Sequence, residues 1–137
     1  MVNGINHIGI AVKNLEESLK TFSGLMPVEH VHRETVEAQK VNVASFIVGN
    51  IMIELLEGTS PESAISKFIE KKGEGIHHIA LQTDDAAYDL TQAIEHGFAP
   101  IDTTPRVGAH NALVGFLHPK STNSVLIEFC QPRNEEH

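Results

Sequence analysis

The sequence predicts an α+β fold built from two tandem βαβββ modules whose mixed sheets curve around a cleft. The principal observation is an internal repeat, in which the strand-like segment 5–12 matches the segment 76–83. The offset is 71 residues (78 − 7) and it aligns His7 with His78. Helix, turn and strand signals follow both segments in the same order. We therefore interpret the chain as one module present twice.

A second pair of segments supports the repeat. Residues 50–56 match residues 124–130, and this match aligns Glu54 with Glu128. Each copy thus contributes one histidine and one glutamate at equivalent positions of predicted strands. We expect module 1 over about 1–57, a linker helix over about 58–73 and module 2 over about 74–132, all within a single domain that covers 1–137.

Composition restricts the class of protein. The chain has 137 residues, of which 41% are hydrophobic, a size and content typical of one globular domain. A net charge of −8 without a basic cluster argues against nucleic acid and against an anionic membrane surface as partners. With a single cysteine, no internal disulfide can form, which is typical of a reducing compartment. No secretory signal is recognised at the N-terminus, so we expect a cytoplasmic protein.

Local signals place the elements of module 1. After the strand at 5–12, Asn14 is expected to cap a helix, with Glu17 as its partner in a capping box. Gly49-Asn50 is typical of a tight hairpin turn. Further strands are expected at about 28–35, 41–48 and 51–57.

The linker and module 2 are predicted in the same way. Ser60 is expected to cap the linker helix, with Pro61 at its first position. Asp85 is expected to cap the helix of module 2, and Gly97 is expected to end it. The apolar residues of this helix expected to face inward are Leu90, Ala93 and Ile94.

Two more strands complete module 2. The segment 111–117 matches 41–47 at an offset of 70 residues, which aligns Phe116 with Phe46. The last strand is expected at 124–130.

The two histidines and two glutamates point to a metal site. Period-two alternation places each glutamate on a strand face among aliphatic neighbours, where an unpaired carboxylate is costly to bury. Two neutral imidazoles and two carboxylates, namely those of His7, His78, Glu54 and Glu128, balance the charge of one divalent cation. Mixed nitrogen and oxygen ligands suit Zn, Fe, Ni, Co or Mn better than Ca or Mg. His77 is a competing ligand, but alternation points it to the opposite, helix-packed face.

Other interpretations remain open at this point. A single histidine or glutamate in a strand is more often structural or solvated than a ligand, and only the coincidence in both copies favours the metal. Lys120 and Arg106 are either ordinary surface residues or the positive charge that an anionic substrate needs. His110, after Gly108, belongs either to a substrate loop or to a plain hairpin entry.

The residues resemble a known superfamily. The matching stretches, which cover nearly the whole chain, are 6–12, 48–57, 75–80, 107–110 and 116–128. In this order and spacing they resemble the vicinal oxygen chelate superfamily of glyoxalase I, extradiol dioxygenases and bleomycin-resistance proteins. Within it, the chain is most similar to the methylmalonyl-CoA epimerase family.

The resemblance implies a set of roles. His7, Glu54, His78 and Glu128 would ligate one divalent transition metal ion (Co, Mn, Ni or Zn), and Glu128 would also be a catalytic base. The substrate would be a small-molecule acyl-CoA thioester, and the protein would be a homodimer. Of the residues left open above, His110 and Lys120 are the ones that we expect to bind this substrate.

The chain departs from the family pattern at one position. Some relatives carry a second catalytic glutamate where this chain has Val43, so the resemblance assigns no second base. Glu34 and Glu37 are nearby candidates for that role.

Three alternative functions follow from the same residues. A lyase of the glyoxalase I type uses the same metal cage. An extradiol dioxygenase is less favoured, because it uses two histidines and one glutamate, whereas Glu54 adds a fourth ligand. A metal-free drug-binding protein favours aromatic walls, but this chain has no Trp and one Tyr.

Overall fold

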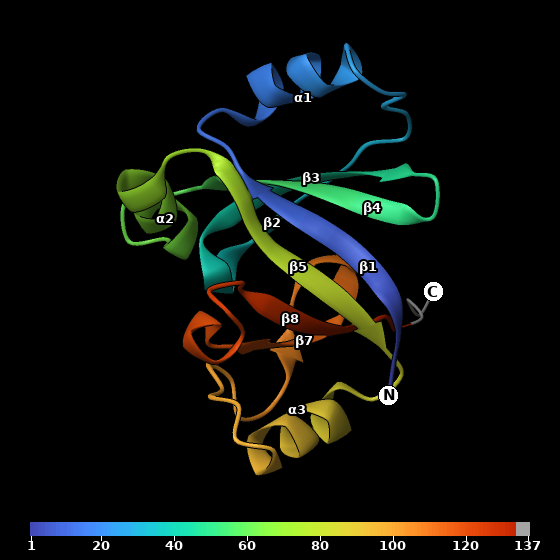
Figure 1. Ribbon diagram of the computed structural model, residues 1–137. Coiled ribbons are helices and arrows are strands. Elements are labelled where there is room, and N and C mark those ends of the chain that lie inside the picture. The colour runs from blue at the N-terminus through green and yellow to red at the C-terminus, as the bar shows by residue number, and fades with distance from the viewer. Residues whose placement is uncertain (134–137) are drawn as a thin grey trace. The chain divides into compact units, whose positions relative to one another are not determined.

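A computed structural model describes residues 1–133 of the chain (Figure 1). These residues form three α-helices and eight β-strands, the α+β class that the sequence predicts. The strands are β1 (Val2–Ala11), β2 (His32–Val36), β3 (Val41–Val48), β4 (Ile51–Gly58), β5 (Gly75–Thr83), β6 (Arg106–Val107), β7 (Leu113–Leu117) and β8 (Ile127–Gln131). The helices are α1 (Leu15–Ser23), α2 (Ala64–Lys72) and α3 (Ala86–Glu95), with short 3₁₀ helices at Glu37–Gln39, Ala109–Asn111 and Pro119–Ser121.

The chain divides into two compact units. Within residues 1–133, the first unit comprises residues 7–77, and the second comprises residues 1–6 together with residues 78–133. The start of β1 therefore belongs to the second unit, where the Asn6 side-chain amide donates a hydrogen bond of 3.0 Å to Gln82 Oε1 on β5. Part of the first strand of each repeat thus belongs to the other unit.

The first unit contains a mixed sheet in the order β2-β3-β4-β1. β2 with β3 and β3 with β4 are antiparallel, whereas β1 pairs with β4 in parallel. The hairpin between β3 and β4 turns at Gly49, whose φ of 65° lies in the left-handed region that glycine adopts easily. The predicted strand at 28–35 is shorter in the structure, where β2 begins at His32.

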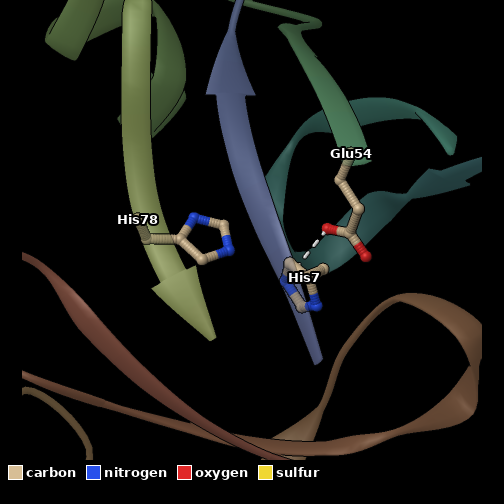
Figure 2. Close-up of side chains that lie close together, drawn as sticks. All are labelled: His7, Glu54 and His78. Atoms are coloured by element: carbon tan, nitrogen blue, oxygen red, sulfur yellow. Dashed lines mark ion pairs between the residues drawn. The ribbon is translucent and has the colours of Figure 1, made fainter. Parts of the chain in front are cut away.

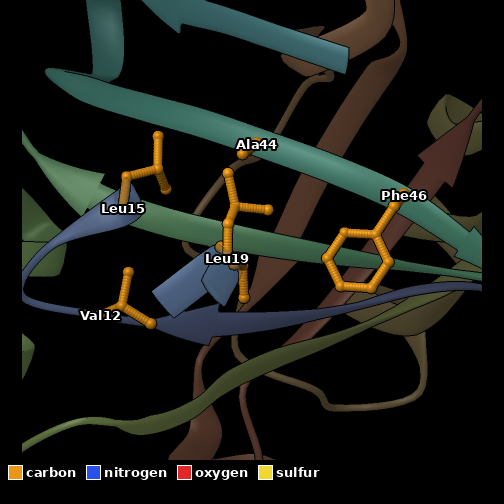
Figure 3. Close-up of a cluster of buried hydrophobic side chains, with 6 residues drawn as sticks. Val12, Leu15, Leu19, Ala44 and Phe46 are labelled. Atoms are coloured by element: carbon orange, nitrogen blue, oxygen red, sulfur yellow. The ribbon is translucent and has the colours of Figure 1, made fainter. Parts of the chain in front are cut away.

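Helix α1 covers one face of this sheet and builds the first core. Asn14 caps it as predicted, because its side-chain oxygen accepts a hydrogen bond of 3.0 Å from the Glu17 N–H. Burying a Leu or Phe side chain contributes about 1.5–3 kcal/mol, so this packing holds the helix on the sheet. The cluster consists of Val12, Leu15, Leu19, Ala44, Phe46 and Leu55 (Figure 3).

The cap predicted for the linker helix is wrong by three residues. Ser63, not Ser60, caps α2, because the Ser63 hydroxyl accepts a hydrogen bond of 3.1 Å from the Ser66 N–H. Residues 60–63 form a turn before the helix, closed by the Ser63 N–H on the Ser60 carbonyl at 3.1 Å. Proline at position 61 therefore lies in this turn, not in the helix.

The second unit repeats the arrangement with β5-β8-β7-β6 and α3. β5 pairs with β8 in parallel, and β7 is antiparallel to both β8 and β6. Asp85 caps α3 as predicted, accepting from the Tyr88 N–H at 3.0 Å. The prediction that Ile94 faces inward is wrong, since this side chain is 38% exposed. The core under α3 consists of Ala86, Leu90, Leu117 and Phe129.

The sequence alignment of Phe116 with Phe46 is off by one residue. Phe46 pairs with Ile53 and packs under α1, whereas Phe116 pairs with Glu128 on the opposite face of its sheet. The true counterpart of Phe46 is Leu117, which packs under α3. A slip of one residue along a strand exchanges the two faces, which is why this register could not be fixed from a loose sequence match.

Within residues 1–133, every helix is too short or too polar to span a membrane.

Candidate functional site

In the first unit, a buried histidine and a buried glutamate meet on neighbouring parallel strands. His7 lies on β1 and Glu54 on β4, where the Cα partner of Glu54 is Gly9. His7 Nε2 and Glu54 Oε1 are 3.3 Å apart, and both side chains are about 95% buried (Figure 2). Because His7 and Gly9 are two residues apart, alternation places the imidazole on the same face of the sheet as the carboxylate.

The second unit contains the equivalent pair. His78 lies on β5 and Glu128 on β8, where the Cα partner of Glu128 is Ala80. His78 Nε2 and Glu128 Oε1 are 3.4 Å apart, and these side chains are equally well buried. The imidazole of His78 extends from the side of β5 in Figure 2. The structure thus brings together His7 with Glu54 and His78 with Glu128, in matching positions of the two units.

Within each unit, the two donor atoms of the pair are spaced as two ligands of one metal ion would be. Nitrogen and oxygen ligands lie about 2.0–2.2 Å from a transition metal, so two neighbouring ligands are separated by about 3.0–3.5 Å. The separations of 3.3 and 3.4 Å fall within that range. His7, Glu54 and His78 are all buried and all carry atoms that can ligate a metal. A divalent ion would offset the several kcal/mol that burial of each carboxylate costs.

Aromatic and charged groups surround the pair in the second unit. The rings of His78 and Phe116 meet edge to face, with their centroids 5.4 Å apart and their planes at 84°. The Arg106 guanidinium lies over the ring of Phe116, 5.7 Å from the ring centroid. Asp102 holds Arg106 there, because its Oδ1 accepts from Arg106 Nε at 3.1 Å. Its Oδ2 accepts from the Phe116 N–H at 2.9 Å, so Asp102 anchors both members of the stack.

Small apolar side chains line the same face around Glu128. Cys130, two residues beyond Glu128 on β8, is buried against a group of small residues. These are Ala80, Ala112 and Val114. Such a lining shields the Glu128 carboxylate from water, so the groups that act on it are its polar neighbours.

The other residues singled out in the sequence lie in different settings. His77 packs edge-on against Phe68 of α2, with ring centroids 5.0 Å apart, which confirms that it faces a helix. His110 is partly buried in the 3₁₀ helix Ala109–Asn111 and has a left-handed φ of 57°. Lys120 is exposed, and its backbone N–H donates to His118 Nδ1 at 3.1 Å. The roles of His110 and Lys120 in substrate binding stay predictions.

Sequence reasoning missed Phe116 and Asp102. The predicted alignment of Phe116 with Phe46 is off by one residue, so it does not indicate that Phe116 lies beside His78. Asp102 falls in a segment without periodicity, Ile101 to Pro105, so no strand or helix pattern pointed to it. An aspartate four residues before Arg106 is the one signal in the sequence that could have suggested the ion pair.

Comparison with known proteins gives consistent results. Residues 6–116 match the family model described as Glyoxalase/Bleomycin resistance protein/Dioxygenase superfamily. The uncharacterized protein YqjC of Bacillus subtilis is 38% identical over 136 residues, which cover 99% of this chain and 97% of that protein. The mitochondrial methylmalonyl-CoA epimerase of Dictyostelium discoideum is 37% identical over 130 residues, which cover 93% of this chain and 77% of that protein.

A solved structure extends the likeness to three dimensions. A variant of Streptomyces coelicolor methylmalonyl-CoA epimerase, in complex with 2-nitronate-propionyl-CoA, is similar with a TM-score of 0.94. It is 32% identical, over 100% of this chain and 99% of that chain. With a duplicated βαβββ fold, paired buried His and Glu residues and a family match over most of its length, the chain belongs to the Glyoxalase/Bleomycin resistance protein/Dioxygenase superfamily.

Proposed function

We propose that this protein is a metal-dependent epimerase that exchanges the α-proton of a 2-substituted acyl-CoA, with methylmalonyl-CoA as the expected substrate. The observation that carries the proposal is the pair of equivalent, buried His–Glu contacts, one in each unit. Relatives at 37% and 32% identity are named methylmalonyl-CoA epimerase and ethylmalonyl-CoA/methylmalonyl-CoA epimerase, and they support the choice of substrate class.

The proposed cofactor is one divalent transition metal ion, Co, Mn, Ni or Zn. Its ligands would be His7 and Glu54 from the first unit and His78 and Glu128 from the second. Two imidazoles and two carboxylates sum to two negative charges, which neutralise a divalent cation in a buried setting. When bound, such an ion would supply Lewis acidity that stabilises the negative charge developing on the thioester oxygen.

Glu128 is the residue that we expect to move the proton. The reaction removes a hydrogen from a carbon between a thioester and a carboxylate and returns one to the opposite side. Glu128 is about 95% buried among small apolar side chains, so water competes little for its oxygen atoms. Its carboxylate can therefore accept the α-proton directly and give it back in the reverse direction.

Substrate binding and assembly complete the proposal. Arg106, held over Phe116 by Asp102, together with His110 and Lys120 would provide positive charge and hydrogen-bond donors for an anionic acyl-CoA. This local charge is needed because the chain as a whole carries a net charge of −8 and repels anions. By analogy with the family we propose a homodimer that acts in the cytoplasm.

The decisive experiment follows deuterium incorporation into methylmalonyl-CoA in heavy water. We expect metal-replete protein to introduce deuterium at the α-carbon and to interconvert the two epimers. The Glu128→Gln variant should fold normally but lose roughly 100-fold or more in exchange rate with at least one of the two epimers. Exchange at the wild-type rate with both epimers in this variant would exclude Glu128 as the base.

The same protein samples can be tested with a glutathione hemithioacetal. An enzyme of the glyoxalase I type would convert this substrate and leave methylmalonyl-CoA unchanged, which would contradict the epimerase proposal.

A further inference from the structure

Strand β2 of the first unit has two faces with different chemistry. Arg33 and Thr35 belong to the face that looks toward α1. The Arg33 guanidinium donates to both carboxylate oxygens of Glu16 on α1, at 3.1 and 3.2 Å. These hydrogen bonds lower the pKa of Glu16. The odd-numbered residues of β2 are therefore fixed on the helix side.

A second network confirms this side of the sheet. The Thr35 hydroxyl donates to Asn42 Oδ1 at 2.6 Å, and the Asn42 amide donates to Glu57 Oε1 at 3.1 Å. Glu57 Oε2 in turn accepts from the Leu15 N–H at the start of α1, at 3.1 Å. The network ties β2, β3 and β4 to the helix and leaves little freedom to rotate β2.

The even-numbered residues of β2 consequently lie on the same face as Glu54. The register pairs Glu34 with Val43 and pairs His32 with Ser45, which is itself the partner of Glu54. Residues directly opposite each other in antiparallel strands point to the same side of a sheet. On this face of the sheet, the residue directly beside Val43 on β2 is therefore Glu34, which carries a carboxylate.

Glu34 is also shielded and oriented. Its side chain is 28% exposed, and its Oε1 lies 3.0 Å from His32 Nε2. The imidazole is 46% exposed, so it connects the carboxylate to solvent. Glu37, the other acidic candidate, is exposed in the 3₁₀ helix that follows β2 and shares no strand face with Glu54.

We propose that Glu34 is the second acid–base residue of the epimerase, an inference that rests on the function proposed above. In one direction the α C–H bond breaks and its proton passes to a carboxylate oxygen of Glu128. The O–H bond of protonated Glu34 then breaks, and its proton forms the new C–H bond on the opposite side of the carbon. Glu34 recovers a proton from solvent through His32, Glu128 loses one, and the enzyme returns to its starting state.

A second acid–base residue at Glu34 explains how Val43 is compatible with epimerisation. Val43 has no ionisable group, so a base on β3 is not available at that position. The carboxylate on the adjacent strand, paired directly with Val43, can serve the same side of the substrate.

The test measures exchange of the α-proton separately from inversion of one epimer into the other. Each epimer of methylmalonyl-CoA is incubated in heavy water with metal-replete wild-type, Glu34→Gln or Glu37→Gln protein, and both deuterium content and epimer ratio are followed. For Glu34→Gln we expect exchange to persist in one epimer only, whereas inversion falls roughly 100-fold or more. Glu37→Gln is the matched control and should behave as wild type.

Two results would overturn the assignment of Glu34. One is inversion by Glu34→Gln at the wild-type rate. The other is loss of exchange in both epimers from a folded, metal-replete variant, because Glu34 would then be needed for the step assigned to Glu128. If wild-type protein itself exchanges no α-proton, the proposed function fails, and this outcome is distinct from either result with the variant.

Discussion

The ring of Phe116 stands edge-on to the imidazole of His78, with centroids 5.4 Å apart and an interplanar angle of 84°. Phe116 is also the Cα partner of Glu128, so one aromatic residue contacts the histidine and adjoins the glutamate of the same pair. Aromatic contacts of this geometry contribute about 0.5–1.5 kcal/mol beyond the area they bury. The contact therefore favours one orientation of His78 over others.

Replacing Phe116 with Leu should weaken binding of the proposed metal ion. The edge-to-face contact is lost while an apolar side chain remains, so we expect the dissociation constant to rise roughly two- to tenfold. Isothermal titration of metal-depleted protein measures this change. Phe98→Leu is the matched control, because Phe98 is 39% exposed and should leave the constant unchanged. Equal affinity in Phe116→Leu would show that the ring does not orient His78.

The equivalence of the two units predicts equal effects at the two histidines. We expect His7→Ala and His78→Ala each to abolish stoichiometric binding of a transition metal, since each pair contributes half of the proposed ligands. Elemental analysis of protein purified without added metal measures the loss. His96→Ala, at the exposed end of α3, is the control and should retain the metal. Full occupancy in either buried variant would contradict the proposed set of ligands.

The close approach of α3 to β7 depends on a glycine. A Cβ at Gly115 would lie 2.5 Å from Leu90 Cδ1, well inside van der Waals contact. We expect Gly115→Ala to lower the free energy of unfolding by about 1–3 kcal/mol, measured by urea denaturation. Adding Leu90→Ala should relieve the clash, so that the two changes together cost less than the sum of their separate effects. Simple additivity would refute the contact.

Because Ser63 and not Ser60 caps α2, we expect the two serines to contribute differently to stability. Ser63→Ala removes the side-chain oxygen that accepts from the Ser66 N–H, and should cost about 1 kcal/mol of unfolding free energy. Ser60→Ala should be nearly neutral, because Ser60 Oγ makes no hydrogen bond to the residues that the structure describes. Both values come from urea denaturation, and a larger loss for Ser60→Ala would restore the original prediction.

Much of the fold follows from local sequence signals. Asn14 and Asp85 cap their helices as predicted, because a short polar side chain before an apolar periodic segment has few other uses. The strands carrying His7 and His78 were also located correctly, since the two copies repeat almost residue by residue. Their pairing with glutamates on parallel neighbours follows from equivalence of the copies.

The errors arise where the sequence does not determine a strand's register or a helix's first turn. The strand carrying Phe116 differs from its counterpart in sequence, so a slip of one position was not detectable and reversed its face. Ser60-Pro61 and Ser63 both satisfy the rules for a helix start, and only the turn closed by the Ser60 carbonyl selects Ser63. Contacts such as Arg106 over Phe116 depend on tertiary packing that no local pattern encodes.

Because residues 1–6 belong to the second unit, a cut at the linker does not separate the two units cleanly. A fragment that begins after the linker would lack Asn3 and Asn6, whose side chains hydrogen-bond to Gln82 on β5. A fragment that ends there would lose residues 75–77, which belong to the first unit. We therefore expect neither copy of the repeat to fold alone, so that severing the polypeptide between them yields two pieces that recover order only when mixed.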